Sequence, residues 1–315
     1  MTEKTSETKP KAPESATLKQ VRAEIDKRGI TQGQVAREIG LSPTTLTQLL
    51  NGTYGADPSN QLEKIVRWLL ALKDQDHVRG QLPSVPDFVL TPTSSRVMAA
   101  LGYAKLAGDI AVIYGGAGLG KTTTVREFQR SYPNVWIATM SPAKASVAAA
   151  FEELCVAVGF RSPAMGAARQ QRDIERRLAG TEGLLIIDEA QHLSIPALDA
   201  IRAIHDATGV GIALVGNEAV YARMTGGNRA AYLDRLFSRI GKKVKLQHPT
   251  STDVETLAGV FNITEKESIV LLCQIGAKAG ALRSVVKILR LATMKAEGKT
   301  PDAVHIREAL KELGV

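Results

Sequence analysis

The sequence predicts an α/β fold: a parallel sheet covered by helices, preceded by an all-α domain and followed by a purely helical region. Three observations support this. Apolar residues keep helical spacing over residues 18–73, short apolar runs alternate with helical stretches over residues 110–246, and helical spacing alone returns from residue 252. Short apolar strands separated by helices are typical of a parallel sheet with both faces covered. The expected strands are Ile110–Tyr114, Val135–Ala138, Leu184–Ile187, Ile212–Val215 and Val244–Leu246.

Composition bounds the class of protein. The 315 residues are 44% hydrophobic and 23% charged, which excludes a chain that is disordered throughout. The net charge of +8 fits either a polyanionic partner or simple solubility. Two cysteines, Cys155 and Cys273, cannot form a disulfide framework. Because no apolar run approaches the roughly 18 residues needed to span a bilayer, we expect no membrane partner and an intracellular protein.

The patterns divide the chain into five segments. Residues 1–16 are rich in Lys, Glu, Thr, Ser and Pro, which predicts a disordered tail. Residues 17–75 fit four short helices, and residues 76–95, with three prolines, predict a linker. Residues 96–250 carry the expected sheet. Residues 251–315 fit about four helices, around 254–261, 265–277, 282–297 and 303–313.

Within the first domain, residues 31–52 have the pattern of a helix-turn-helix. Thr31 is a helix cap with Gln34 as its capping-box partner, Gly40 ends the first helix, and Ser42-Pro43 opens the second. The second helix of this motif lies in the DNA major groove. The motif therefore predicts contacts with double-stranded DNA, although some helix-turn-helix domains bind only protein. The predicted DNA contacts are Gln32, Pro43, Thr44, Thr47 and Gln48.

These outward residues include no arginine able to pair with guanine, so we expect little sequence preference. A second basic region lies between residues 219 and 250, and its side chains would neutralise phosphates and make binding salt-dependent. The predicted contacts there are Arg223, Arg229, Lys242 and Lys243.

The strongest motif follows the first expected strand. Residues 115–122 match the P-loop pattern GxxxxGK[ST], with a strand before it and a helix-forming stretch after it. Glycines let backbone N–H groups converge on phosphate oxygens, and the helix N-terminus adds its positive dipole end. We expect Lys121 to reach the β- and γ-phosphates of ATP and Thr122 to ligate Mg²⁺. The predicted nucleotide-binding residues are Gly115, Gly116, Ala117, Gly118, Leu119, Gly120, Lys121, Thr122 and Thr123.

Polar residues end two later strands. Asp188 and Glu189 follow the buried run Leu184–Ile187, at the strand end where open α/β sheets bind ligands. Asp188 would hold the Mg²⁺ shell and Glu189 would polarise the attacking water. Asn217, after the run Ile212–Val215, would hydrogen-bond the γ-phosphate or its water, or else simply start a loop.

These strand-end motifs, in this order and before a helical region, resemble the AAA+ ATPases. The resemblance implies a P-loop AAA+ core over residues 96–250 and a C-terminal helical lid over residues 251–315. It also implies a lid arginine at the nucleotide, which Arg283 matches, and an arginine that completes a neighbouring subunit's site. For the latter we favour Arg239, with Arg235 as the alternative.

Taken with the helix-turn-helix, nearly the whole chain resembles one AAA+ subgroup, the target-DNA activators of Mu-like phages. The resemblance implies ATP-dependent helical filaments on double-stranded DNA, recruitment of a DDE-type transposase, transposition immunity, hydrolysis stimulated by DNA and partner, and a bacterial host cytoplasm. One departure is Gln191, where that family has an acidic residue; we expect it to leave the chemistry unchanged. The segments that carry the resemblance are residues 184–193, 216–217, 220–221, 224–229, 236–240 and 280–283.

Two other functions remain open: a helicase loader with the same fold, and a DNA-binding regulator whose P-loop only senses nucleotide. The segment 224–229 (MTGGNR) is unexplained by a helicase loader. Glu189 argues against a pure sensor, because a sensor needs no carboxylate beside Asp188.

Overall fold

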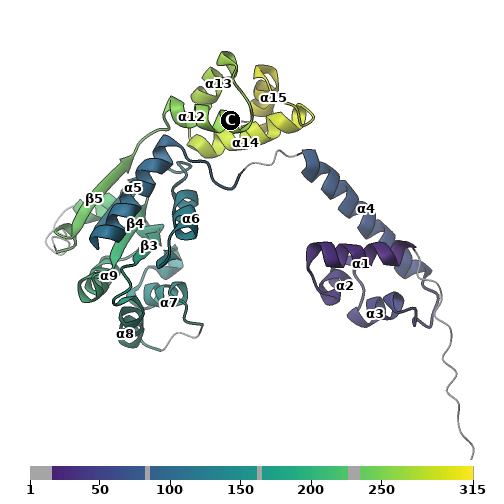
Figure 1. The fold of residues 1–315 in the computed structure, drawn as a ribbon, viewed down its shortest axis with the longest axis horizontal. Helices are drawn as coiled ribbons and strands as arrows, with labels where there is room; N and C mark the ends of the chain where they lie inside the picture. The colour runs from purple at the N-terminus through teal and green to yellow at the C-terminus, as the bar shows by residue number, and fades with distance from the viewer. Residues whose placement is uncertain (1–15, 82–85, 162–164, 226–234, 315) are drawn as a thin grey trace, which may run out of the picture. The chain divides into compact units, whose positions relative to one another are not determined.

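The computed structural model describes residues 16–81, 86–161, 165–225 and 235–314. The chain forms two compact units, residues 1–82 and 83–315. The described residues of the first unit form helices, and the second unit contains the sheet and the C-terminal helices (Figure 1).

The first unit packs four helices around its own apolar core, with Val21, Val35, Leu46 and Ile65 fully buried. Its helix ends confirm the predicted helix-turn-helix: Thr31 and Gln34 form a capping box, Gly40 takes the left-handed conformation with φ 77°, and Ser42 caps the next helix. The helices are α1 (Ala16–Arg28), α2 (Gln32–Ile39), α3 (Pro43–Leu50) and α4 (Ser59–Gln81).

The segment predicted as a linker, residues 76–95, differs in the structure at both ends. Helix α4 continues to Gln81, and α5 (Pro92–Ala107) already begins at Pro92. A proline at the first helical position lacks only an N–H that would have had no helical partner. Thr91 caps this helix in a capping box with Ser94, so Pro92 starts a helix rather than marking a linker.

The predicted parallel sheet is confirmed. Five strands pair in the order β2-β3-β4-β1-β5, and every neighbouring pair is parallel. Strand β4 lies between β3 and β1, so the C-terminal ends of β1, β4 and β3 lie along the same edge of the sheet. The strands are β1 (Ile110–Gly115), β2 (Val135–Thr139), β3 (Leu184–Asp188), β4 (Gly211–Gly216) and β5 (Ile240–Leu246).

Strand β5 begins at Ile240, four residues before the predicted start at Val244. The added residues include Gly241, Lys242 and Lys243, which carry no apolar signal. β5 is an edge strand that pairs only with β1, so its polar residues remain exposed. An edge strand does not need the continuous apolar run of a central one.

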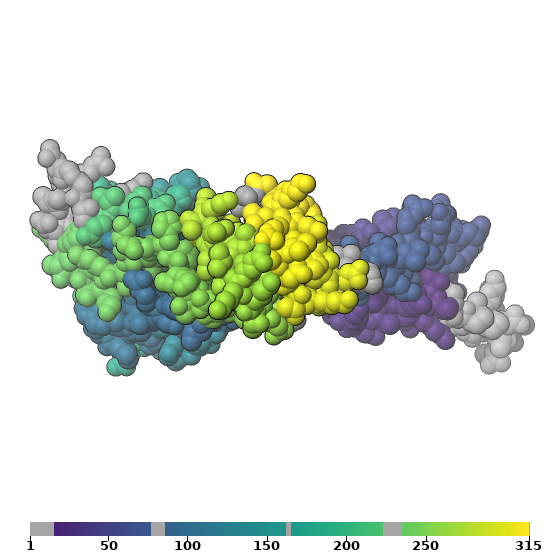
Figure 2. Space-filling view, turned by 90° about the horizontal axis from the view of Figure 1, so that it is seen from above, coloured from purple at the N-terminus to yellow at the C-terminus, as the bar shows by residue number. Residues whose placement is uncertain are grey.

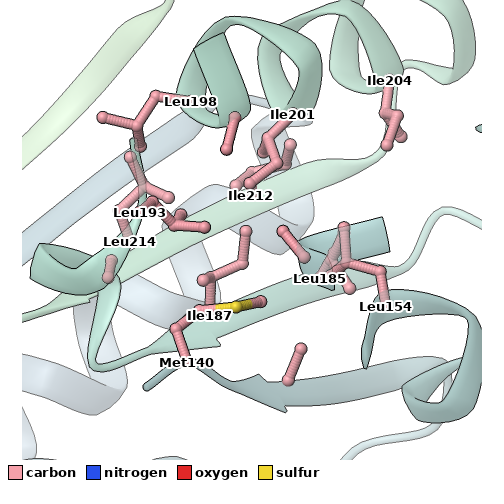
Figure 3. Packing of buried hydrophobic residues seen from close by; sticks show 14 of the residues in the cluster. Met140, Leu154, Leu185, Ile187, Leu193, Leu198, Ile201, Ile204, Ile212 and Leu214 are labelled. Atoms are coloured by element: carbon pink, nitrogen blue, oxygen red, sulfur yellow. The ribbon is translucent and has the colours of Figure 1, made fainter. Parts of the chain in front are cut away.

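Helices cover both faces of the sheet. On one face, α9 (Ile195–Thr208) places Leu198, Ile201 and Ile204 against Ile212 and Leu214 of β4 (Figure 3). Helices α7 (Val147–Ala157) and α8 (Ala167–Leu178) complete this layer. On the other face, α5 and α6 (Lys121–Ser131) pack against the alternate strand residues. This two-sided burial explains why the central strands are continuously apolar.

Four helices after the sheet form the predicted lid, with a core of its own. Figure 2 shows their surface from green to yellow. Buried Asp253 ties the lid to α5: its carboxylate accepts the Thr93 N–H at 2.7 Å and the Thr93 hydroxyl at 2.8 Å. The lid helices are α12 (Ser251–Val260), α13 (Lys266–Gly276), α14 (Ala281–Lys295) and α15 (Ala303–Leu313).

Among the residues that the structure describes, no helix combines the length and the apolar character needed to cross a membrane.

Candidate functional site

The P-loop joins the end of β1 to the start of α6. Gly118 and Gly120 have φ of 81° and 80°, in the left-handed region that favours glycine. A Cβ atom on Gly118 would lie 2.0 Å from the carbonyl oxygen of Gly280, at the start of the lid helix α14. The loop therefore needs glycine both for its conformation and for its close approach to the lid.

Lys121 begins α6 and turns back over the loop. Its Nζ donates to the carbonyl oxygens of Gly115 at 2.9 Å and Gly116 at 2.7 Å. Burial lowers the pKa of this amine, whereas the negative charges of Glu189 and Asp188 raise it and the positive charge of Arg283 lowers it. Side chains from α6, β3 and α14 thus share one electrostatic site.

Asp188 ends β3 and is buried. Its Oδ2 accepts the Thr122 hydroxyl at 2.7 Å, and its Oδ1 accepts the Glu189 N–H at 3.0 Å. Burial raises the pKa of this carboxyl, although both hydrogen bonds lower it. Hydroxyl and carboxylate oxygens side by side are the donors that Mg²⁺ prefers, so Thr122 and Asp188 fit this ion.

Glu189 follows in the left-handed conformation, with φ 56°. Its carboxylate accepts a hydrogen bond from Nε2 of Gln191, which lies in the short helix η2 (Ala190–His192). The Gln191 Oε1 accepts the backbone N–H of Asn217 at 3.2 Å. Gln191 therefore connects two predicted site residues. From the sequence, Gln191 stands out only as a departure from the acidic residue of the family, with no expected effect on the chemistry. Sequence reasoning missed this connection because Asn217 is 26 residues away in the sequence.

Asn217 lies at the end of β4, exposed, as its position in the sequence predicts. Its Oδ1 accepts the N–H of Ala219 at 2.9 Å, in the first turn of α10 (Glu218–Thr225). Its side chain thus already caps a helix.

Arg283 of the lid reaches the P-loop through its backbone, since its N–H donates to the Gly118 carbonyl at 3.2 Å. Its exposed side chain is close enough to lower the pKa of Lys121. The structure therefore brings together Lys121, Thr122, Asp188, Glu189 and Arg283.

Arg239 has different neighbours. It lies in the turn before β5, and its guanidinium pairs with both carboxylate oxygens of Asp206 in α9, at 3.0 and 3.1 Å. It also donates to the carbonyl oxygen of Arg235 at 2.8 Å. Arg235 itself is exposed.

The predicted DNA contacts of the helix-turn-helix lie on its surface. Pro43, Thr44, Thr47 and Gln48 of α3 are exposed. The Oε1 of Gln32 accepts the Thr47 hydroxyl at 3.3 Å, so the N-terminus of α2 is joined to α3. Helix α3 contains no charged residue, which leaves only polar and apolar atoms on this face.

Edge strand β5 carries three exposed lysines, and two of them, Lys242 and Lys243, lie over aromatic rings on opposite faces of the strand. Lys242 lies 5.9 Å from the ring centre of Tyr103, and Lys243 lies 4.7 Å from that of Phe237. Of the other predicted contacts, Arg223 belongs to α10, and Arg229 lies outside the described residues.

Family models match three parts of the chain. A helix-turn-helix model matches residues 18–61, an AAA domain model residues 106–224, and a model described as "Mu B transposition protein, C terminal" residues 238–313.

Full-length relatives cover most of the chain. The "ATP-dependent target DNA activator B" of Escherichia phage Mu is 37% identical over 295 residues, which is 93% of both chains. The "Mu-like prophage FluMu DNA transposition protein B" of Haemophilus influenzae is 34% identical and covers 81% of this chain and 88% of its own.

Solved structures share the fold of the second unit. The Cdc6p protein from Pyrobaculum aerophilum has a TM-score of 0.54 at 16% identity, covering 72% of this chain and 69% of its own. The ORC2 protein of Aeropyrum pernix has a TM-score of 0.51 at 19% identity, covering 70% and 66%. At these identities the likeness concerns the fold alone.

Proposed function

Because this chain belongs to the family of Mu B transposition proteins, the ATP-dependent target DNA activators, we propose that it is an ATPase whose nucleotide state controls its assembly on double-stranded DNA. The assembled form recruits a transposase, which in turn stimulates ATP hydrolysis and release from the DNA. The relatives come from phages and a bacterial prophage, so the proposed place of action is the cytoplasm of a bacterial host.

One observation carries the proposal: Lys121, Asp188 and Glu189 share an electrostatic site at the end of the parallel sheet. Phosphoryl transfer needs positioned charge more than covalent chemistry. The ammonium group of Lys121 now donates to two carbonyl oxygens of the loop. We propose that it exchanges these hydrogen bonds for phosphate oxygens when ATP binds. Glu189, half-buried, orients the attacking water and draws its proton.

Mg²⁺, when bound with ATP, supplies positive charge at the phosphates. Thr122 and Asp188 would hold it through the two oxygens that now share a hydrogen bond. The Nδ2 amide group of Asn217 would donate to a phosphate oxygen or to the water, because its Oδ1 caps α10. Arg283 would add a second cation from the lid.

For Arg239 we propose a role in a neighbouring subunit's site, with Arg235 as the alternative. Its pairing with Asp206 within the chain would then exchange for a phosphate contact on assembly. Hydrolysis would follow oligomerisation, which suits a helical filament on DNA.

We propose that DNA is contacted both by the outer face of α3 and by the basic residues near β5, Lys242 and Lys243 among them. The exposed polar residues of α3 favour weak, sequence-tolerant contacts. Lysines on an exposed strand edge favour phosphate contacts, which carry no sequence information.

The test measures ATP binding, ATP hydrolysis and sedimentation with long duplex DNA, for the unmodified protein and two variants. Lys121→Ala should lose ATP binding and ATP-dependent assembly. Glu189→Gln should keep both, lower hydrolysis by about a hundredfold or more, and stay on DNA longer. Lys105→Ala removes a half-buried lysine of α5 that donates to the Glu182 carbonyl; this variant is the matched control and should behave as the unmodified protein.

Equal DNA assembly with and without ATP would contradict the proposed control by nucleotide. ATP binding without any hydrolysis, even with DNA, would instead indicate a regulator that senses nucleotide.

A further inference from the structure

Gln191 occupies a position that the proposed chemistry does not explain. It is 8% exposed, and both polar atoms of its side chain are used. Nε2 donates to the carboxylate of Glu189, and Oε1 accepts the backbone N–H of Asn217 at 3.2 Å. A buried amide with both ends bonded has a fixed orientation, because a rotation would leave donors facing donors.

Packing leaves this side chain little other room. Gly216 ends β4, and a Cβ atom there would lie 2.3 Å from Gln191 Oε1 and 2.5 Å from Cγ2 of Val220. The amide therefore lies directly against the backbone of β4, just before Asn217. The absent side chain at Gly216 makes this close approach possible.

The backbone of Glu189 adopts the left-handed conformation, with φ 56°, and its side chain is half-buried. Its charge interacts with Lys121 of α6 and Asp188 of β3. Coulombic interactions such as these do not by themselves fix the direction of a carboxylate, whereas a hydrogen bond does. The hydrogen bond from Gln191 selects one orientation.

We propose that Gln191 is a positioning residue for ATP hydrolysis: it holds the Glu189 carboxylate in register with the end of β4 and with Asn217. This inference rests on the proposed ATPase function and deepens it. Gln191 acts through its hydrogen bond to Glu189, so we expect it to affect the rate of the chemical step. It also makes the position of Glu189 depend on the backbone at Asn217, and hence on the start of α10, which Asn217 caps.

The first test is steady-state ATP hydrolysis by the full chain with DNA. Gln191→Leu keeps the approximate volume and removes both hydrogen bonds. We expect kcat to fall by about tenfold or more with KM for ATP within about twofold, because a misplaced catalytic group slows chemistry without weakening binding. Gln170→Leu is the matched control: Gln170 is 7% exposed, and its helix α8 packs against α7 and α9, so this variant should leave kcat unchanged.

The second test separates positioning from a merely structural role. Gln191→Glu keeps the acceptor for Asn217, but its ionised carboxylate repels Glu189 and donates nothing. When protonated, the same side chain donates an O–H to Glu189. We therefore expect the ratio of its kcat to that of the unmodified protein to rise as the pH falls, while the ratio for Gln191→Leu stays flat. This comparison decides the matter even if Gln191→Leu folds poorly.

The outcomes keep the two proposals apart. Absence of hydrolysis by the unmodified protein, or no effect of Glu189→Gln, would refute the proposed function. If Glu189→Gln abolishes hydrolysis while Gln191→Leu retains full kcat, or if the pH profile of Gln191→Glu runs parallel to that of the unmodified protein, the positioning role is wrong and the ATPase stands.

Discussion

At the scale of single residues, burial of Asp188 disfavours the ionised carboxylate that its proposed role requires. It is 1% exposed and faces Glu189, so its ionised form is disfavoured and its pKa is raised, mainly by burial. Asp253 is equally buried and shows the reverse. Burial would raise its pKa, but hydrogen bonds from Thr93 and Thr250 outweigh this and lower it. The pKa values of these two buried carboxyls thus shift in opposite directions, because hydrogen-bond donors outweigh burial only at Asp253.

Asp188→Asn should raise stability in the absence of nucleotide. A carboxyl with a raised pKa stabilises the fold at low pH and loses this contribution as the pH rises through its folded-state pKa. We expect the variant to unfold at a higher temperature than the unmodified protein at about neutral pH. The difference should disappear as the pH falls below 3.8, the ordinary value for this carboxyl. ATP hydrolysis should fall by about a hundredfold or more, because the variant loses the carboxylate that we propose as a Mg²⁺ ligand.

Asp253→Asn is the control, and we expect it to change stability in the opposite direction. Its lowered pKa means that the ionised carboxylate stabilises the fold above 3.8 and that this contribution is lost in acid. The amide cannot accept every bond from Thr93 and Thr250, so thermal unfolding should occur at a lower temperature near neutral pH. Stabilisation by both substitutions, or by neither, would contradict this account.

Residue by residue, motifs located Lys121, Thr122, Asp188 and Glu189 because P-loop chemistry needs these types at set spacings. The same reasoning missed Gln191 and Asp253. Both act through partners far away in sequence, Asn217 for one and Thr93 for the other. Such pairs have no local pattern, so only the folded chain reveals them.

At the scale of elements, β5 lies at the edge of the described sheet and carries three lysines, of which Lys242 and Lys243 lie on opposite faces. The apolar runs predicted the central strands. They did not predict residues 240–243 of β5, because the polar residues of an edge strand can remain exposed to solvent. Its backbone pairs with β1, and β1 leads into the P-loop. The proposed DNA contacts on β5 are therefore one strand away from the nucleotide site.

Replacing Lys242 and Lys243 by alanine should weaken DNA binding evenly across sequences. Each phosphate contact contributes about 0.9 to the slope of log K against log salt, so the double variant should lose about two from that slope. Titration of duplex DNA at several salt concentrations measures this. The exposed lid lysines Lys287 and Lys311, replaced together, are the matched control and should leave the slope unchanged. An unchanged slope for the β5 pair would place the DNA path elsewhere.

At the scale of the whole molecule, the two units have separate apolar cores. The periodicities of the sequence predicted both, since a change of period marks the change from helices alone to alternating strands and helices. The boundary between them was less accurate, because prolines mark helix starts as readily as linkers.

Leu46→Ala should therefore destabilise the first unit alone. Leu46 is fully buried, and such a truncation costs about 2–5 kcal/mol. In calorimetry the transition of residues 1–82 should shift to lower temperature, while ATP affinity stays within about twofold. Leu101→Ala, fully buried in α5, should shift the other transition instead. Loss of ATP affinity in Leu46→Ala would show that the units do not fold independently.

The contact between Gly118 and the start of α14 has a mechanical consequence. The backbones of Gly118 and Gly280 approach each other there without a side chain between them. The Arg283 N–H donates to the carbonyl oxygens of both glycines. A movement of α14 must therefore either break the hydrogen bond from Arg283 to Gly118 or displace the P-loop with it. While that bond holds, a change in the position of α14 would be transmitted directly to the P-loop.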